Sequence, residues 1–181
     1  MDHGSAPLIV VGCAVLVEAA MRFHPFWLSS AAHLYVLATS GLPSALLPLA
    51  TFLVLWLVMR ARRSRSGLGT GRQGYGVVVL VTLALLVLAP VVTFFLGPLL
   101  VIGLGLVVLG WRGRDRALWV TGLVLGVVSP LAALYTFENR ARFLGPAPTS
   151  LVLVLSALTI LSLGIWRLRA ERSVLAQTPA P

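Results

Sequence analysis

Charged side chains are scarce in this sequence, and lysine does not occur at all. Only 10% of the 181 residues are charged, whereas roughly 25% are charged in an ordinary soluble domain. Hydrophobic residues make up 59% of the chain, and the mean hydropathy is +0.99. These values exclude an ordinary soluble fold. We expect an all-α, polytopic helical membrane protein with short loops, no soluble domain and the lipid bilayer as its surroundings.

Cysteine and acidic residues are rarer still, with one cysteine and five acids in the chain. Cys13 is the only cysteine, which excludes an intrachain disulfide, a Cys-x-x-Cys redox pair and a thiolate metal cluster. We expect it to be a small buried side chain. His24 and His33 lie nine residues apart, with no further ligand at suitable spacing. The sequence therefore indicates no metal, no cofactor and no set of catalytic residues, so an enzyme is not expected.

All fourteen basic residues are arginines, and the formal net charge is +9. In a soluble domain this excess would indicate nucleic acid. Here the arginines gather just outside apolar segments, where lipid headgroups and the direction of membrane insertion explain them, so we expect no nucleic-acid partner. The lack of lysine and the abundance of Leu, Val, Ala and Gly are typical of a GC-rich bacterial genome. They favour a bacterial plasma membrane as the location.

The most arginine-dense stretch, residues 60–72, orients the whole chain. Its five arginines lie between two long apolar segments, and arginine-rich short loops stay on the cytoplasmic side of a membrane. The same charges suit anionic lipid headgroups. The residues that we expect to set topology and to contact acidic lipid are Arg60, Arg62, Arg63 and Arg65.

Apolar segments of spanning length follow one another on both sides of this loop. They predict about six transmembrane helices, at residues 7–23, 43–59, 74–96, 98–111, 117–137 and 149–166. Cytoplasmic loops are expected at 60–73 and 112–116, with a cytoplasmic tail at 167–181. Residues 24–42 are either an interfacial helix, which we favour, or a seventh span. In the first case both termini are cytoplasmic; in the second the N-terminus lies outside. No signal-peptide cleavage site is recognisable, so the first segment is expected to be retained.

Two independent patterns agree with this topology. Eleven of the fourteen arginines fall in segments assigned to the cytoplasm, and three fall outside. Aromatic residues gather at the cytoplasmic ends of the spans, as an aromatic belt requires: Trp56, Tyr75, Trp111, Trp119 and Trp166.

Glycines are concentrated between residues 97 and 130. Small residues let helix backbones approach closely in lipid, so we expect this hairpin to pack tightly, on itself or on a partner chain. The glycines that would make this contact are Gly103, Gly105, Gly122 and Gly126. The stretch reads as Gly-Pro-Leu, a glycine-bearing helix, an arginine-rich turn and a second helix with Gly-x-x-x-Gly. In this it resembles uncharacterised Gly-rich two-helix membrane domains of actinobacterial proteins. The resemblance implies no activity.

Few other residues within the spans carry chemistry. Pro90 and Pro130 lie inside spans and are expected to kink them. Glu18 lies in the last turn of the first span, and Arg22 follows four residues later on the same helical face, in the order that favours an ion pair. An acid at membrane depth is also a candidate for function. The alternative to the ion pair is therefore an intramembrane polar site that uses Glu18 and His33.

Three functions remain open. The scarcity of polar groups and the Gly-x-x-x-Gly face favour a non-catalytic accessory or assembly subunit, bound to another membrane protein or to a second copy of itself. The first alternative is a small transport or solute-binding component. In size the chain is similar to the membrane-embedded substrate-binding subunits of energy-coupling-factor vitamin transporters, but it lacks their Ala-x-x-x-Ala motif, because Glu18 follows Ala14. The second alternative is a lipid-interacting or sensor protein that uses residues 60–65.

Overall fold

The computed structural model describes residues 5–22, 46–61, 75–88, 96–134, 136–140 and 148–177. These residues are almost entirely helical and contain no strand, which confirms the all-α fold class. Several predicted features lie outside the described residues: the segment 24–42 with His33, the kink at Pro90, and Arg62, Arg63 and Arg65 of the first basic loop.

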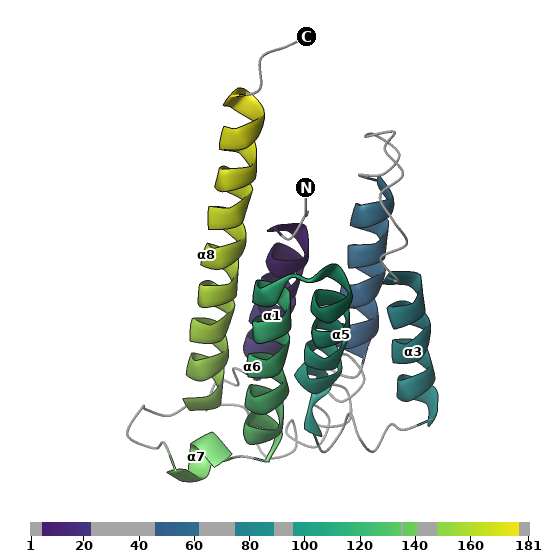
Figure 1. Ribbon diagram of the computed structural model, residues 1–181. Coiled ribbons are helices and arrows are strands. Elements are labelled where there is room, and N and C mark those ends of the chain that lie inside the picture. Colours follow the sequence, from purple (N-terminus) through teal and green to yellow (C-terminus); the bar gives the residue numbers. More distant parts are fainter. Residues whose placement is uncertain are drawn as a thin grey trace.

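The helices differ in length. Three of them, α1 (Ser5–Arg22), α6 (Arg116–Ala133) and the first 26 residues of α8 (Pro148–Gln177), are long and apolar enough to cross a membrane. The helix Leu46–Ala61, which carries no label in Figure 1, and α5 are apolar but shorter. The number of spans therefore stays a prediction. The labelled helices are α1 (Ser5–Arg22), α3 (Tyr75–Leu88), α5 (Pro98–Gly113), α6 (Arg116–Ala133), α7 (Thr136–Arg140) and α8 (Pro148–Gln177).

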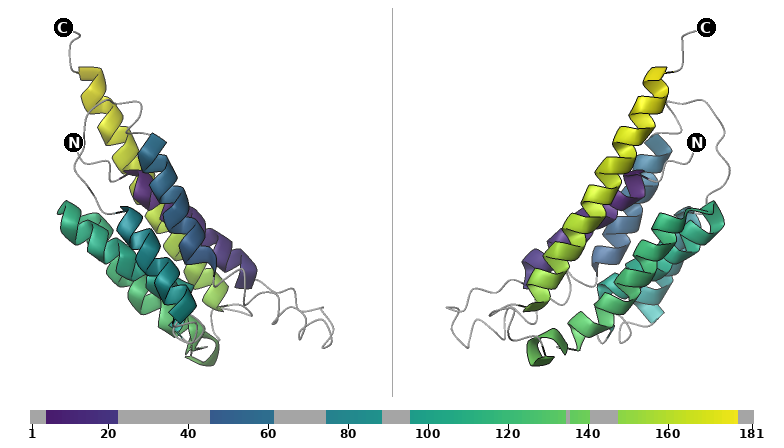
Figure 2. Two further views of the ribbon diagram at one scale, coloured as in Figure 1. Left: turned by 90° about the vertical axis from the view of Figure 1, so that its right-hand side faces the viewer. Right: turned by 60° about the vertical axis from the view of Figure 1, so that its left-hand side comes forward.

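Successive long helices run in opposite directions (Figure 1). The start of α1, the turn between α5 and α6, and the end of α8 lie at one end of the bundle, which we call the turn end. The short helix α7 lies at the other, the α7 end. Two helix pairs make the main contacts: α5 with α6, and α1 with α8, although α1 and α8 come from opposite ends of the chain (Figure 2).

Two glycines that the sequence analysis did not single out let α1 and α8 approach closely. A Cβ at Gly12 would meet Leu161 Cγ at 2.6 Å, and a Cβ at Gly164 would meet Ile9 Cγ1 at 2.9 Å. The buried side chains around them belong to one apolar cluster that also takes in Leu46–Ala61, α5 and α6. Its fully buried members include Leu8, Val11, Val15, Phe52, Leu55, Ile102, Leu106, Leu125, Leu153 and Ala157.

The outer surface of the bundle is also apolar. Large aliphatic side chains face outward on every long helix, among them Val17, Leu57, Leu80, Val108, Val127 and Leu155. A monomeric soluble protein rarely exposes contiguous apolar surface of this extent. The exposed faces therefore suit a lipid environment. Cys13 belongs to this outer surface, so the prediction of a buried cysteine is wrong. Its side chain lies away from the Gly12 face that packs on α8.

The clearest departures from the predicted segment ends are at the ends of α6 and α8. α6 ends at Ala133, and the chain turns into α7 before residue 137. α8 continues to Gln177, so most of the predicted tail 167–181 is helical. Two polar contacts hold this extension against the rest of the bundle. Arg167 pairs with Asp115, and Ser5 donates a hydrogen bond to Glu171 at 2.8 Å. No proline interrupts the helix between Pro148 and Pro179.

Candidate functional site

The hairpin of α5 and α6 brings three of the predicted packing glycines together. A Cβ at Gly103 would lie 2.6 Å from the carbonyl oxygen of Gly122 and 2.8 Å from the nitrogen of Gly126. A Cβ at Gly122 would lie 2.6 Å from the carbonyl oxygen of Gly103. These neighbours are backbone atoms, which cannot move aside as side chains do. A further glycine, Gly110, approaches the nitrogen of Trp119 in the same way. The two backbones therefore touch along the hairpin.

Gly105 and Gly126 differ from Gly103 and Gly122 in what an added Cβ would meet. A Cβ at Gly105 would collide with the ring of Phe52, so this glycine joins the hairpin to the helix Leu46–Ala61. A Cβ at Gly126 would meet no atom of the described residues within 4 Å. The Gly-x-x-x-Gly motif is thus divided: Gly122 faces α5, and the Cβ direction of Gly126 points into open space.

Asp115 organises the turn between α5 and α6. Its Oδ1 accepts hydrogen bonds from the backbone N–H groups of Ala117, at 3.0 Å, and Leu118, at 3.4 Å, which makes Asp115 the N-cap of α6. Its Oδ2 accepts a hydrogen bond from Arg167 Nη1 of α8 at 2.6 Å. The side chain of Asp115 is only 8% exposed. The carboxylate of Asp115 therefore caps the N-terminus of α6 and links this helix to α8.

Arg114 ends α5 in a conformation that favours glycine. Its φ is +53° and its ψ is +27°, in the left-handed region. Backbone hydrogen bonds fix this geometry, because the N–H of Arg114 donates to Trp111 O at 3.1 Å and the N–H of Asp115 donates to Gly110 O at 2.8 Å. Among the described residues, Arg114 is the only non-glycine residue with a positive φ.

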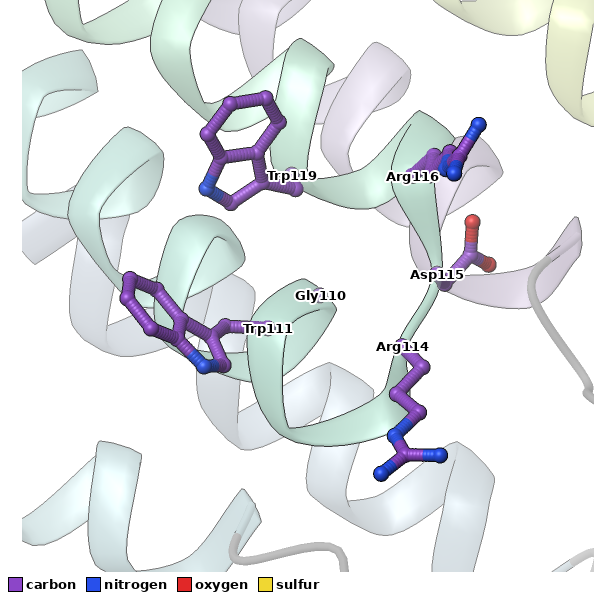
Figure 3. Close-up of a pocket in the computed structure, with 6 residues that line it drawn as sticks. All are labelled: Gly110, Trp111, Arg114, Asp115, Arg116 and Trp119. Carbon is purple, nitrogen blue, oxygen red and sulfur yellow. The ribbon is translucent and has the colours of Figure 1, made fainter.

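A shallow hollow of about 380 Å³ lies at this turn (Figure 3). The indole rings of Trp111 and Trp119 lie on one side of the hairpin, and the side chains of Arg114 and Arg116 extend from the turn itself. Trp111 is 76% exposed and Trp119 is 38% exposed. The six residues that line the hollow are Gly110, Trp111, Arg114, Asp115, Arg116 and Trp119.

A second polar cluster lies toward the α7 end, where α1 finishes. Arg22 Nε donates to Glu18 Oε1 at 2.7 Å, and Arg22 Nη1 donates to the carbonyl oxygen of Ala132 in the last turn of α6 at 3.1 Å. The predicted ion pair between Glu18 and Arg22 is therefore present in the structure. The Glu18 side chain is 1% exposed, and its second oxygen, Oε2, has no hydrogen-bond partner within the described part of the chain.

Ser129 ties the start of α5 to α6 at the α7 end. Ser129 Oγ donates to Leu96 O at 2.7 Å and accepts from the N–H of Leu100 at 2.8 Å. Gly97 has φ +81°, and a Cβ there would lie 2.7 Å from Ser129 Oγ, which explains a glycine before Pro98. Pro130 lies inside α6, four residues before the cap at Leu134. Pro130 therefore lies in the last turn of α6.

Five further hydroxyls within the helices bond to their own helix. Thr51, Thr82, Ser156, Thr159 and Ser162 each donate to the carbonyl oxygen four residues earlier. Such bonds satisfy a hydroxyl in an apolar environment without a neighbour. In the helices that the structure describes, no group of three or more His, Cys, Asp or Glu side chains is placed to hold a metal ion.

Arg60 is the described member of the first basic cluster. It is exposed, and its guanidinium lies 5.3 Å from the centroid of the Trp56 ring, a distance typical of a cation–π contact.

The ion pair of Asp115 with Arg167 was not expected from the sequence. The N-cap role of Asp115 could be read from the sequence, because an aspartate directly before an apolar run marks a helix N-cap. The pairing with Arg167 could not, because that residue lies 52 positions later in the chain.

Comparison with known proteins adds no family: no protein-family model, curated protein or solved structure matches the chain. The resemblance of residues 97–130 to the Gly-rich two-helix domains of actinobacterial proteins therefore stays a prediction.

Proposed function

We propose that the chain is a multi-pass protein of a bacterial plasma membrane, with six antiparallel spans and both termini in the cytoplasm. The three helices of spanning length, the alternating helix directions and the apolar outer surface support this arrangement. The turn end carries Arg112, Arg114, Arg116 and the arginines of α8. Under the positive-inside rule, this end is the cytoplasmic one.

Within that membrane, the protein acts as a non-catalytic accessory or assembly subunit that binds an apolar helix of another membrane protein or of a second copy. The observation that carries this proposal is the outward Cβ direction of Gly126. Exposed aliphatic side chains lie beside it on α6: Leu123, three residues earlier, and Val127, the next residue. A glycine in such a face leaves a notch into which a partner helix can pack closely, which is the main source of helix association in lipid.

Gly126→Ile is expected to fill this notch and to release the partner while the hairpin stays intact, because a Cβ at this position meets no atom of the described helices within 4 Å. The measurement is affinity purification of a C-terminally tagged chain in mild detergent, followed by mass spectrometry of proteins and small molecules. We expect recovery of the partner to fall at least about tenfold, which corresponds to a loss of roughly 1.4 kcal/mol in binding.

The matched control is Gly113→Ile, which adds the same side chain at the other end of the hairpin, where a Cβ also meets nothing within 4 Å in the part of the chain that the structure describes. It should retain the partner. Full recovery of the partner by Gly126→Ile would contradict the accessory-subunit proposal.

One observation favours a second function, a small solute-binding or transport component. Glu18 Oε2 is a buried acceptor with no partner among the described residues, and a buried acceptor left unsatisfied is costly. The same purification distinguishes the two functions. A chain that purifies alone with a defined small molecule, and loses that molecule on Glu18→Gln, would favour solute binding over the accessory role.

A further inference from the structure

The turn between α5 and α6 carries positive charge that its own carboxylate does not neutralise. Arg112, Arg114 and Arg116 are all exposed, and none of them forms an ion pair within the described ranges. The one acid of the turn, Asp115, is engaged by Arg167 and by two N–H groups of α6. Three guanidinium groups within five residues are therefore available to an anion from outside.

The conformation of Arg114 adds a second observation. The position requires a left-handed backbone, which glycine adopts without cost and other residues rarely adopt. Gly113 stands one residue earlier, yet the left-handed position itself holds arginine. Sparsely populated backbone conformations tend to cluster where a side chain serves a function. The side chain at this left-handed position is that of Arg114, so its guanidinium is the candidate functional group of the turn.

The hollow beside these arginines is lined by aromatic carbon. Trp111 and Trp119 lie on the same side of the hairpin (Figure 3), and both are exposed. Tryptophan prefers the headgroup level of a bilayer, where one part of the ring meets apolar chains and the N–H meets polar groups. Arginine binds phosphate oxygens through two parallel N–H groups. The hollow of about 380 Å³ is lined by both rings and by Arg114 and Arg116, whose side chains extend from the turn away from the rings (Figure 3), so an apolar wall lies next to anion-binding groups.

We propose that this hollow binds the headgroup of an anionic phospholipid. The phosphodiester lies against Arg114 and Arg116, and the glycerol and the first part of the acyl chains lie against Trp111 and Trp119. The inference rests on the membrane setting of the proposed function but not on a protein partner, so lipid binding can fail or succeed independently of partner recovery with Gly126→Ile.

The test is native mass spectrometry of the full-length, purified protein in zwitterionic detergent, titrated with dioleoylphosphatidylglycerol or dioleoylphosphatidylcholine. We expect the anionic lipid to bind at least about tenfold more tightly, and Arg114→Gly and Arg116→Gln to weaken it roughly fivefold each, which is the effect of one arginine at an anionic surface. Arg114→Gly relieves the left-handed strain, so its unfolding midpoint should not fall. Loss of lipid by this variant cannot then be a loss of folding.

The control is Arg169→Gln, which removes an exposed arginine of α8 and should leave binding unchanged. Equal binding of the two lipids, or wild-type binding by both turn variants, would overturn the proposal. So would binding of glycerol phosphate as tightly as the lipid, which would indicate a site for a free phosphate ester. Loss of the anionic lipid only on substitution of Arg62, Arg63 and Arg65 by Gln would also overturn it and would place the lipid at the first basic loop.

Discussion

Gly103→Ala is expected to loosen or separate α5 from α6, with a loss of roughly 1–3 kcal/mol of stability. The added methyl group would lie 2.6 Å from Gly122 O and 2.8 Å from Gly126 N, and neither helix can yield without losing contact along the hairpin. In an isolated helix the same change would be favourable by about 1 kcal/mol. The measured loss of stability is therefore the cost of the steric clash minus this gain in helix propensity. The midpoint of unfolding in detergent, by heat or by added SDS, checks it.

Gly126→Ala is the matched control for this prediction. It adds the same methyl group to the facing helix, in a direction where none of the described residues lies within 4 Å. We expect it to be neutral or slightly stabilising. An equal loss of stability in both variants would contradict the assignment of Gly103 to the helix contact and of Gly126 to the outer face.

The second large effect is expected for Arg22→Leu. It would leave the carboxylate of Glu18, 1% exposed, without its only ionic partner among the described residues. Breaking a buried ion pair from one side typically costs about 3–5 kcal/mol, because the remaining charge is neither paired nor solvated. The Ala132 carbonyl would also lose the hydrogen bond that ties α1 to α6. The unfolding midpoint in detergent should fall accordingly.

The double variant Glu18→Leu with Arg22→Leu should recover most of this loss, since replacing both members of a buried pair by apolar residues is often neutral. Arg169→Leu, at an exposed position of α8, is the control for removal of an arginine as such. If Arg22→Leu is no more harmful than Arg169→Leu, the Glu18 cluster does not hold the bundle together.

The sequence predicted the local features of this fold well because they depend on neighbours in the chain. Helical structure follows from long apolar runs. The Glu18–Arg22 pair follows from a spacing of four residues, and the start of α5 follows from Gly97 and Pro98. The close approach at Gly103 and Gly122 was also indicated by composition, although the sequence left open whether it served the hairpin or a partner.

Long-range pairings left no comparable signal. The partnership of α1 with α8 depends on Gly12 and Gly164, which are separated by most of the chain and form no motif. The outward position of Gly126 could not be separated from the inward position of Gly122, because both belong to one Gly-x-x-x-Gly pattern. The left-handed conformation of Arg114 contradicts local preference, which would place a glycine there. The candidate lipid site thus became visible only in three dimensions.

The central claim is that α5 and α6 cross a membrane, with the arginine-rich turn inside and α7 outside. Labelling of single cysteines in intact cells by a membrane-impermeant maleimide tests this most directly. In a Cys13→Ser background, Gly113→Cys reports on the turn and Asn139→Cys on α7, both at exposed positions. We predict that Asn139→Cys reacts once any outer barrier is opened, and that Gly113→Cys reacts only after the plasma membrane is permeabilised. Reaction of both cysteines from the same side would contradict the proposed topology.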